Sequence, residues 1–219
     1  ALATANLANL RSLGQAAAMY SNDHPIMPPF RLPSGEVHTS TGRPRARWHF
    51  SMGDYVGQPY LPRTQAERDA FTGGDDGSSR TDDMPRIDND VFRDPTHDVE
   101  HFEAENGEIK SLWNGSYGYN YQYLGNTRSE GPNGEAANFP VRLHSIHAAA
   151  RTVVFADSKG NQNTVRELGL REHAYTLDPP RLDTQTHHAT TFAEDDGPSP
   201  ADVRHNGRAM VAFLDGHAA

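Results

Sequence analysis

The pattern of apolar and polar positions predicts one long helix, at the start of the chain. Between residues 6 and 23 the larger apolar side chains recur every three or four positions, which places them on one helical face: Leu7, Leu10, Leu13, Ala17 and Tyr20. Asn6 and Asn9 are the odd members, because asparagine is a weak helix former. Pro25 ends the helix, since proline cannot continue one. No N-cap residue precedes the helix at Ala1, so we expect a chain cut or processed out of a longer helix.

Residues 25–98 are rich in proline, glycine, aspartate and arginine, and the helical signal there is limited to residues 64–71. In that segment Thr64 is followed three positions later by Glu67, which is the spacing of a capping box. The polar run over residues 72–83 predicts an exposed loop. Its acidic residues lack the spacing of an EF-hand, so a solvated loop is favoured over a calcium site. Residues 91–95 are predicted to form a short strand that ends in a turn.

Four tyrosines alternate with small or polar residues in the middle of the chain: Tyr117, Tyr119, Tyr121 and Tyr123. This period of two predicts a strand with one aromatic face. A row of aromatic rings can bind sugars or bases, or it can pack a sheet against a helix. The packing role is the more common one, and we favour it.

Two β-rich runs, residues 150–158 and 208–217, follow in the last third of the chain. Each run carries an aspartate at its end, and side-by-side pairing of the two strands would bring Asp157 and Asp215 together. His205 lies in the turn before the final strand, and His217 follows Asp215. A cluster of these four residues would be able to hold a divalent metal, calcium through the carboxylates or zinc through the imidazoles. The favoured interpretation is structural: Asp215 and Gly216 form a turn, and His205 hydrogen-bonds to the backbone.

Composition narrows the classes of function. The 219 residues are 35% hydrophobic, and no apolar stretch approaches the roughly 20 residues of a membrane span. The formal net charge of −9 argues against a nucleic-acid partner, because such binding normally uses a basic face. The absence of cysteine excludes disulfides and thiolate chemistry. The sequence lacks the phosphate-loop, dinucleotide-binding, zinc-protease and nucleophile-elbow motifs. The assignment of a hydrolase activity would therefore rest on the abundance of histidine alone.

Four segments, in order along the chain, resemble one bacterial family. Residues 6–23 resemble the part of the N-terminal helix that follows the membrane in prepilin-like proteins. Residues 116–121 are similar to the central tyrosine motif of that group, and residues 153–158 to its penultimate strand. His205, followed after nine residues by Asp215 and Gly216, resembles the C-terminal signature. The group is that of the type II secretion G-like pseudopilins with a prepilin-type processing-associated domain.

The resemblance implies an α+β fold. A truncated pilin-type helix over residues 1–24 would pack on an antiparallel sheet within a head of residues 25–219 that carries long loop-rich insertions. It implies a preceding apolar helix that anchors the precursor in the bacterial inner membrane, with the head in the periplasm or at the cell surface. The implied partners are other pilin-like subunits and secretion-apparatus proteins, and no catalysis is implied.

The resemblance has limits in the C-terminal region and at one proline. G-like pseudopilins often carry a structural calcium ion in a C-terminal loop, but that region differs here and its ligands do not carry over. Relatives often have Cys-Pro where this chain has Asp94-Pro95, so no thiol role transfers. Two other classes of function remain open. One is an extracytoplasmic glycan- or metal-binding module that uses the tyrosine strand and the histidine-rich loops, and the other is a hydrolase.

Overall fold

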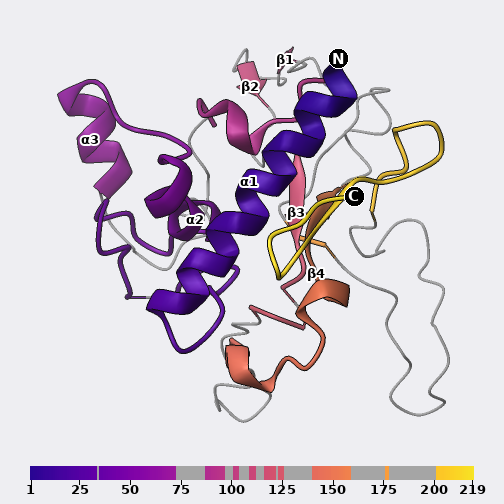
Figure 1. The fold of residues 1–219 in the computed structure, drawn as a ribbon. Coiled ribbons are helices and arrows are strands. Elements are labelled where there is room, and N and C mark those ends of the chain that lie inside the picture. Colours follow the sequence, from indigo (N-terminus) through magenta and orange to yellow (C-terminus); the bar gives the residue numbers. More distant parts are fainter. Residues whose placement is uncertain are drawn as a thin grey trace, which may run out of the picture.

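A long helix lies across a small antiparallel sheet in the computed structural model of this chain (Figure 1). The fold is therefore of the α+β class. The structure describes residues 1–33, 35–72, 87–96, 101–103, 109–111, 116–121, 123–125, 140–158, 176–177 and 201–219.

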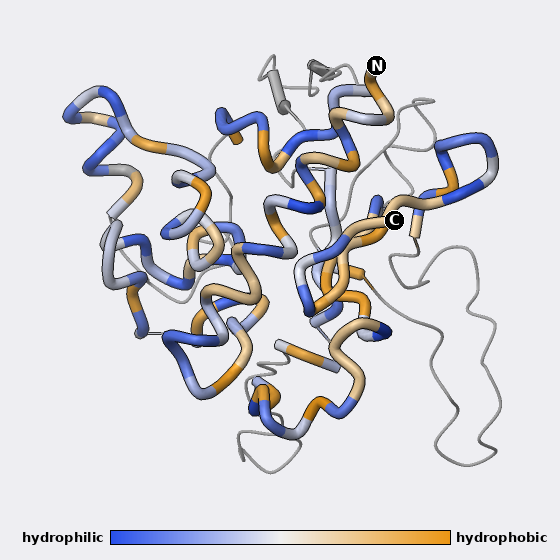
Figure 2. The backbone as a smooth tube through the Cα atoms, in the orientation of Figure 1, coloured by the Kyte–Doolittle hydropathy of each residue, from blue (hydrophilic) through white to orange (hydrophobic). Residues whose placement is uncertain are grey.

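Helix α1 (Leu2–Asp23) confirms the helix that the apolar pattern predicts, and it ends one residue before His24. Its inner face is buried, with Leu10, Leu13 and Ala17 fully removed from solvent. In Figure 2 the tube of α1 changes between apolar and polar colours from turn to turn, as expected of a helix with one side on the core. Within the described residues, no helix combines the length and the apolar character needed to cross a bilayer.

The main sheet has the order β3 (Tyr117–Tyr119), β4 (Val153–Asp157) and β5 (Val211–Phe213), and both pairings are antiparallel. Helix α1 packs against β4 and β5. The strands β1 (His101–Glu103) and β2 (Ile109–Ser111) form a separate antiparallel pair. Within the described residues there are also three short 3₁₀ helices: η2 (Asp90–Phe92), η3 (Leu143–Ser145) and η4 (Ala149–Arg151).

Helix α2 (Trp48–Val56) was not expected, because the sequence analysis placed the only helical signal of this region further on. The helix supplies the centre of the core: Trp48 is fully buried, and its ring lies 4.6 Å from that of Phe155, centroid to centroid. Gly57 follows the helix with a φ of 89°, a conformation that glycine adopts without strain. A glycine after an aromatic run is the sequence signal that was overlooked.

Helix α3 (Gln65–Thr72) confirms the second predicted helix and its capping box. The backbone N–H of Glu67 donates to the Thr64 hydroxyl over 3.1 Å, and the N–H of Thr64 donates to the Glu67 carboxylate over 3.0 Å. Two backbone N–H groups at the start of the helix therefore have side-chain acceptors.

Two predicted strands differ from the observed structure. Residues 90–92 form η2 in place of a strand, because the side chain of Asn89 accepts the N–H of Val91 and starts a turn. The tyrosine strand is only three residues long. After Tyr119 the backbone turns, and the N–H of Gly125 donates to the carbonyl of Tyr121 over 2.9 Å. Gly125 is required in that turn, since a Cβ there would overlap the Pro28 carbonyl and the Tyr119 ring.

Candidate functional site

The candidate site is a buried polar cluster between the first turns of α1 and the end of the sheet where β3 begins and β4 ends. It is made of Asn6, Asp94, Tyr117, Asp157, Arg204 and His205. Five separate segments contribute to it, so only the folded chain assembles it. The cluster contains two of the four predicted metal ligands, Asp157 and His205.

A tight turn places His205 in the cluster. The N–H of His205 donates to the carbonyl of Arg208 over 3.0 Å, and Arg208 returns the bond over 3.1 Å. Between them Asn206 and Gly207 have φ values of 53° and 77°. Asparagine and glycine tolerate this left-handed conformation better than other residues, so an Asn-Gly pair closes the turn at low cost.

Asp157 is the acceptor at the centre of the cluster. Its side chain is fully buried at the end of β4. Oδ1 accepts a hydrogen bond from Asn6 Nδ2 over 3.0 Å, and Oδ2 accepts one from the backbone N–H of Met210 over 2.8 Å. The Nε2 atom of His205 lies 3.3 Å from Oδ2. Burial raises the pKa of this carboxyl, against the opposing effects of Arg204 and of the two hydrogen bonds.

Asn6 connects the helix to this acceptor, and it explains why asparagine interrupts the apolar face of α1. Its side chain is fully buried. Oδ1 accepts a short hydrogen bond of 2.5 Å from the Tyr117 hydroxyl, while Nδ2 lies 2.8 Å from His205 Nε2. Burial raises the pKa of Tyr117, so its hydroxyl remains a neutral donor. Asn9, the second odd residue, donates to the carbonyl oxygens of Asp90 and Arg93, each over 2.9 Å.

Asp94 and Arg204 supply the remaining charges. The Asp94 side chain is fully buried, and its Oδ1 accepts hydrogen bonds from the N–H and the hydroxyl of Thr96 over 2.8 and 2.7 Å. Its Oδ2 lies 3.3 Å from Arg204 Nε and 3.7 Å from His205 Nε2. Arg204 also lies 3.5 Å from Asp157 Oδ1 and donates to the Ser116 carbonyl over 3.0 Å. The sequence analysis missed both residues, because their role depends on partners distant in the chain.

The structure separates Asp215 and His217 from the cluster. Strands β4 and β5 run antiparallel, with Val153 opposite Phe213, so Asp157 and the residue after β5 lie at opposite ends of the pair. The expectation that Asp157 and Asp215 lie together was therefore wrong. His217 instead donates from Nδ1 to Asp215 over 2.5 Å, and this hydrogen bond lowers the pKa of the Asp215 carboxyl.

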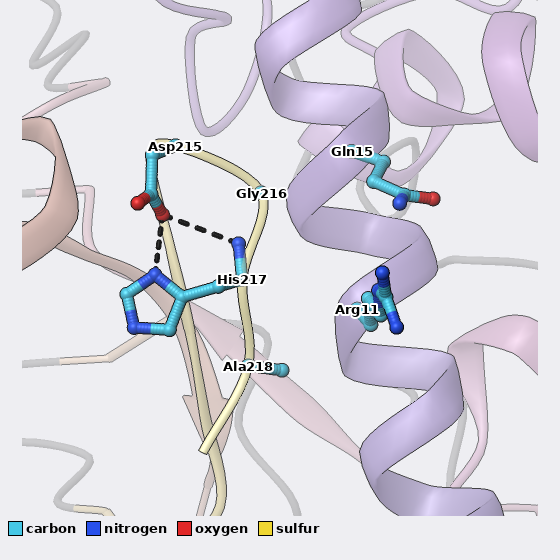
Figure 3. Close-up of a pocket in the computed structure, with 6 residues that line it drawn as sticks. All are labelled: Arg11, Gln15, Asp215, Gly216, His217 and Ala218. Carbon is cyan, nitrogen blue, oxygen red and sulfur yellow. Dashed lines mark hydrogen bonds and ion pairs between the residues drawn. The ribbon is translucent and has the colours of Figure 1, made fainter.

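Figure 3 shows the surroundings of this exposed pair, where a shallow pocket of about 450 Å³ separates α1 from the C-terminal turn. Arg11 and Gln15 line it from the helix, and residues 215–218 line it from the turn. The His217 ring stacks on Phe213 with its centroid 4.2 Å away, on the other side of the turn from the two helix side chains in that view. The residues from opposite sides do not converge on one point.

The residues that resemble the C-terminal signature lie against α1 at two points. His205 contacts Asn6 before β5, and Gly216 approaches Gln15 after it, where a Cβ on Gly216 would lie 3.5 Å from the Gln15 side chain. Asn6 and Gln15 are nine positions apart in the helix, which is about 14 Å along the axis. The nine residues between His205 and Asp215 thus join two contacts with the same helix. Figure 1 shows this C-terminal segment beside α1.

The tyrosine row does not form an exposed platform. Tyr117 and Tyr119 are buried in β3, Tyr121 is half-buried, and Tyr123 is exposed beyond the strand. Tyr119 donates from its hydroxyl to the Pro28 carbonyl over 2.8 Å. The first two rings therefore have the packing role that the sequence analysis favoured. The histidine-rich loop and the acidic run over residues 73–83 lie outside the described residues.

No family model, curated protein or solved structure matches this chain. A proposal for its function must therefore be argued from the sequence and the structure. The donor set of the buried polar cluster is unsuited to calcium. That ion takes six to eight oxygen ligands, whereas the cluster combines two carboxylates with an imidazole and a guanidinium.

Proposed function

We propose that this chain is the head of a pseudopilin-like structural subunit in a type II secretion or type IV pilus-like apparatus. The observation that carries the proposal is the use of the C-terminal signature to hold α1. His205 contacts the helix at Asn6 before β5, and Gly216 approaches it at Gln15 after β5. In a structural subunit, the residues of the family signature are expected to hold the N-terminal helix against the head.

The exposed first turn of α1 also supports the proposal. Residues 1–5 are all exposed, and Leu2 keeps 57% of its surface in solvent. The geometry thus leaves room for an apolar helix ahead of Ala1, as the resemblance implies. In this proposal that helix anchors the precursor in the inner membrane, and the head lies in the periplasm or at the cell surface. Other pilin-like subunits and secretion-apparatus proteins are the partners.

The other two classes of function find less support in the geometry. A glycan-binding module would need its aromatic rings exposed, and Tyr117 and Tyr119 are 1% and 0% exposed. A hydrolase would need its titratable groups at the surface of a cleft. Here the charged groups of the buried polar cluster are enclosed, and Asp94 and Asp157 have side-chain exposures of 0%.

Fractionation of cells that produce the complete gene product tests the proposal. The product is expected in the inner membrane, and its mass is expected to fall by that of a short leader when a prepilin peptidase is co-produced. A catalytically inactive peptidase is the control. A product that stays in the cytoplasm with the same mass under both conditions contradicts the proposal.

A further inference from the structure

We propose that Asp94, Asp157 and His205 form a binding site for one first-row divalent metal ion, with Zn²⁺ as the representative ion. The three side chains each offer one ligand atom, and these atoms all lie within 4.8 Å of one another. They come from the segment after η2, the end of β4 and the turn before β5. The site is independent of the proposed function, because it concerns the chemistry of the cluster and not the assembly of the chain.

The orientation of Asn6 indicates that a positive group belongs between His205 and Asp157. Because Asn6 Oδ1 accepts from Tyr117, its Nδ2 must face the other two residues. That amide donates toward His205 Nε2 over 2.8 Å, so Nε2 presents a lone pair there. Asp157 Oδ2 presents its own lone pairs only 3.3 Å away. Two acceptors at this distance repel each other unless a proton or a metal ion lies between them.

Asp94 adds a third acceptor, close to the other two. Its side chain is fully buried, and among the described residues no donor hydrogen-bonds to Oδ2. The nearest cation is the Arg204 guanidinium, with Nε at 3.3 Å, and His205 Nε2 lies 3.7 Å away. Buried carboxylate oxygens are normally satisfied, because their desolvation is costly. A metal ion bound to Oδ2 would satisfy this oxygen.

The charge of the surroundings favours a divalent cation. Among the described residues, three carboxylates face one guanidinium here, since Arg204 also lies 3.6 Å from Asp202. With a neutral imidazole the group carries a net charge of −2, which one divalent ion would balance. Two carboxylate oxygens and one imidazole nitrogen are donors that suit Zn²⁺ and similar ions better than Ca²⁺. Metal binding requires the Asn6 contact with Nε2 to give way, while its bond to Asp157 Oδ1 remains available.

Calorimetric titration of the chelator-treated chain with ZnCl₂ tests the site. The expected result is one ion per chain and a rise in the melting temperature with Zn²⁺, because an ion that binds only the folded state stabilises it. Asp94→Asn should weaken binding by at least about tenfold. His217→Gln is the matched control, since His217 also faces a carboxylate but lies outside the cluster, and it should leave binding unchanged.

Other outcomes overturn the proposal. If the melting temperature of the unaltered chain does not respond to Zn²⁺, a proton occupies the position and the metal site is refuted. Binding that survives Asp94→Asn and is lost in His217→Gln belongs to the exposed pair. A larger response to CaCl₂ than to ZnCl₂ contradicts the donor assignment. If Asp94→Asn does not fold, X-ray absorption at the zinc edge of the unaltered chain tests the site. One imidazole and several oxygen ligands are expected, and more than one imidazole would contradict the site.

Discussion

Asn6 donates a hydrogen bond from Nδ2 to Oδ1 of Asp157 over 3.0 Å, and so joins the first turns of α1 to the end of β4 across 151 positions of sequence. The same amide group accepts from Tyr117 and lies beside His205. A single polar side chain on the apolar face of α1 therefore connects the helix to two strands of the sheet. Both ends of this buried amide have hydrogen-bond partners, and paired buried polar groups favour one arrangement of the elements that carry them.

Replacing Asn6 by alanine should lower the free energy of unfolding by about 2–3 kcal/mol, because Tyr117 and Asp157 would lose a buried partner. Urea denaturation followed by circular dichroism measures this change. Asn22→Ala is the matched control, since Asn22 is an exposed asparagine of the same helix, and it should change stability by less than about 0.5 kcal/mol. Equal effects of the two substitutions would show that the network contributes nothing specific.

Gly14 permits the close approach of α1 to the C-terminal strand. A Cβ at this position would lie 3.3 Å from both the Ala212 Cβ and the Phe213 carbonyl oxygen. Gly14→Val should therefore destabilise the chain by about 1–3 kcal/mol through overpacking. Ala8→Val, on the exposed face, should cost only about 0.5 kcal/mol through helix propensity. A Gly14→Val chain as stable as the Ala8→Val chain would mean that the helix can move away at no cost.

The stability of the chain should fall with acid through His38. Burial lowers the pKa of this imidazole below its usual value, although Asp54, whose carboxylate lies 3.3 Å from Nε2, acts in the opposite direction. Because the pKa is lower in the folded state than in the unfolded state, the unfolded chain binds more protons as the pH falls through about 6.5. The contribution of neutral His38 to the free energy of unfolding is thus complete above that pH and is lost as the pH falls below it.

Urea denaturation at pH 7.5 and at pH 5.0 measures this contribution. His38→Gln should lose less stability between the two pH values than the unaltered chain does. His24→Gln, which removes an exposed histidine, should behave like the unaltered chain. A pH dependence that is the same in His38→Gln and in the unaltered chain would contradict the assignment to His38.

The sequence could predict the local features of this fold but not the partners within the cluster. Helix α1 and the capping box of α3 follow from spacings of three and four residues, and both are observed. The direction in which β4 and β5 pair is not encoded in either strand, so Asp215 was placed beside Asp157 when it lies at the opposite end. Asp94 carried no signal, since an aspartate before a proline is typical of a turn and its burial depends on Arg204. Asn6 did carry a signal, because it is a polar residue on the apolar face of a predicted helix.

The proposed function, a subunit that assembles with other pilin-like subunits, predicts that the exposed face of α1 contacts neighbouring subunits. The chain has no cysteine, so single cysteines can report on one position at a time. In cells that produce the complete gene product, Ala8→Cys should react slowly with a membrane-impermeant maleimide, yet rapidly in the isolated chain. Leu61→Cys, at a position that is 59% exposed and lies in the segment between α2 and α3, normalises the labelling. Protection of Ala8→Cys only in the cell envelope is the predicted result, and equal labelling in both settings would contradict the claim.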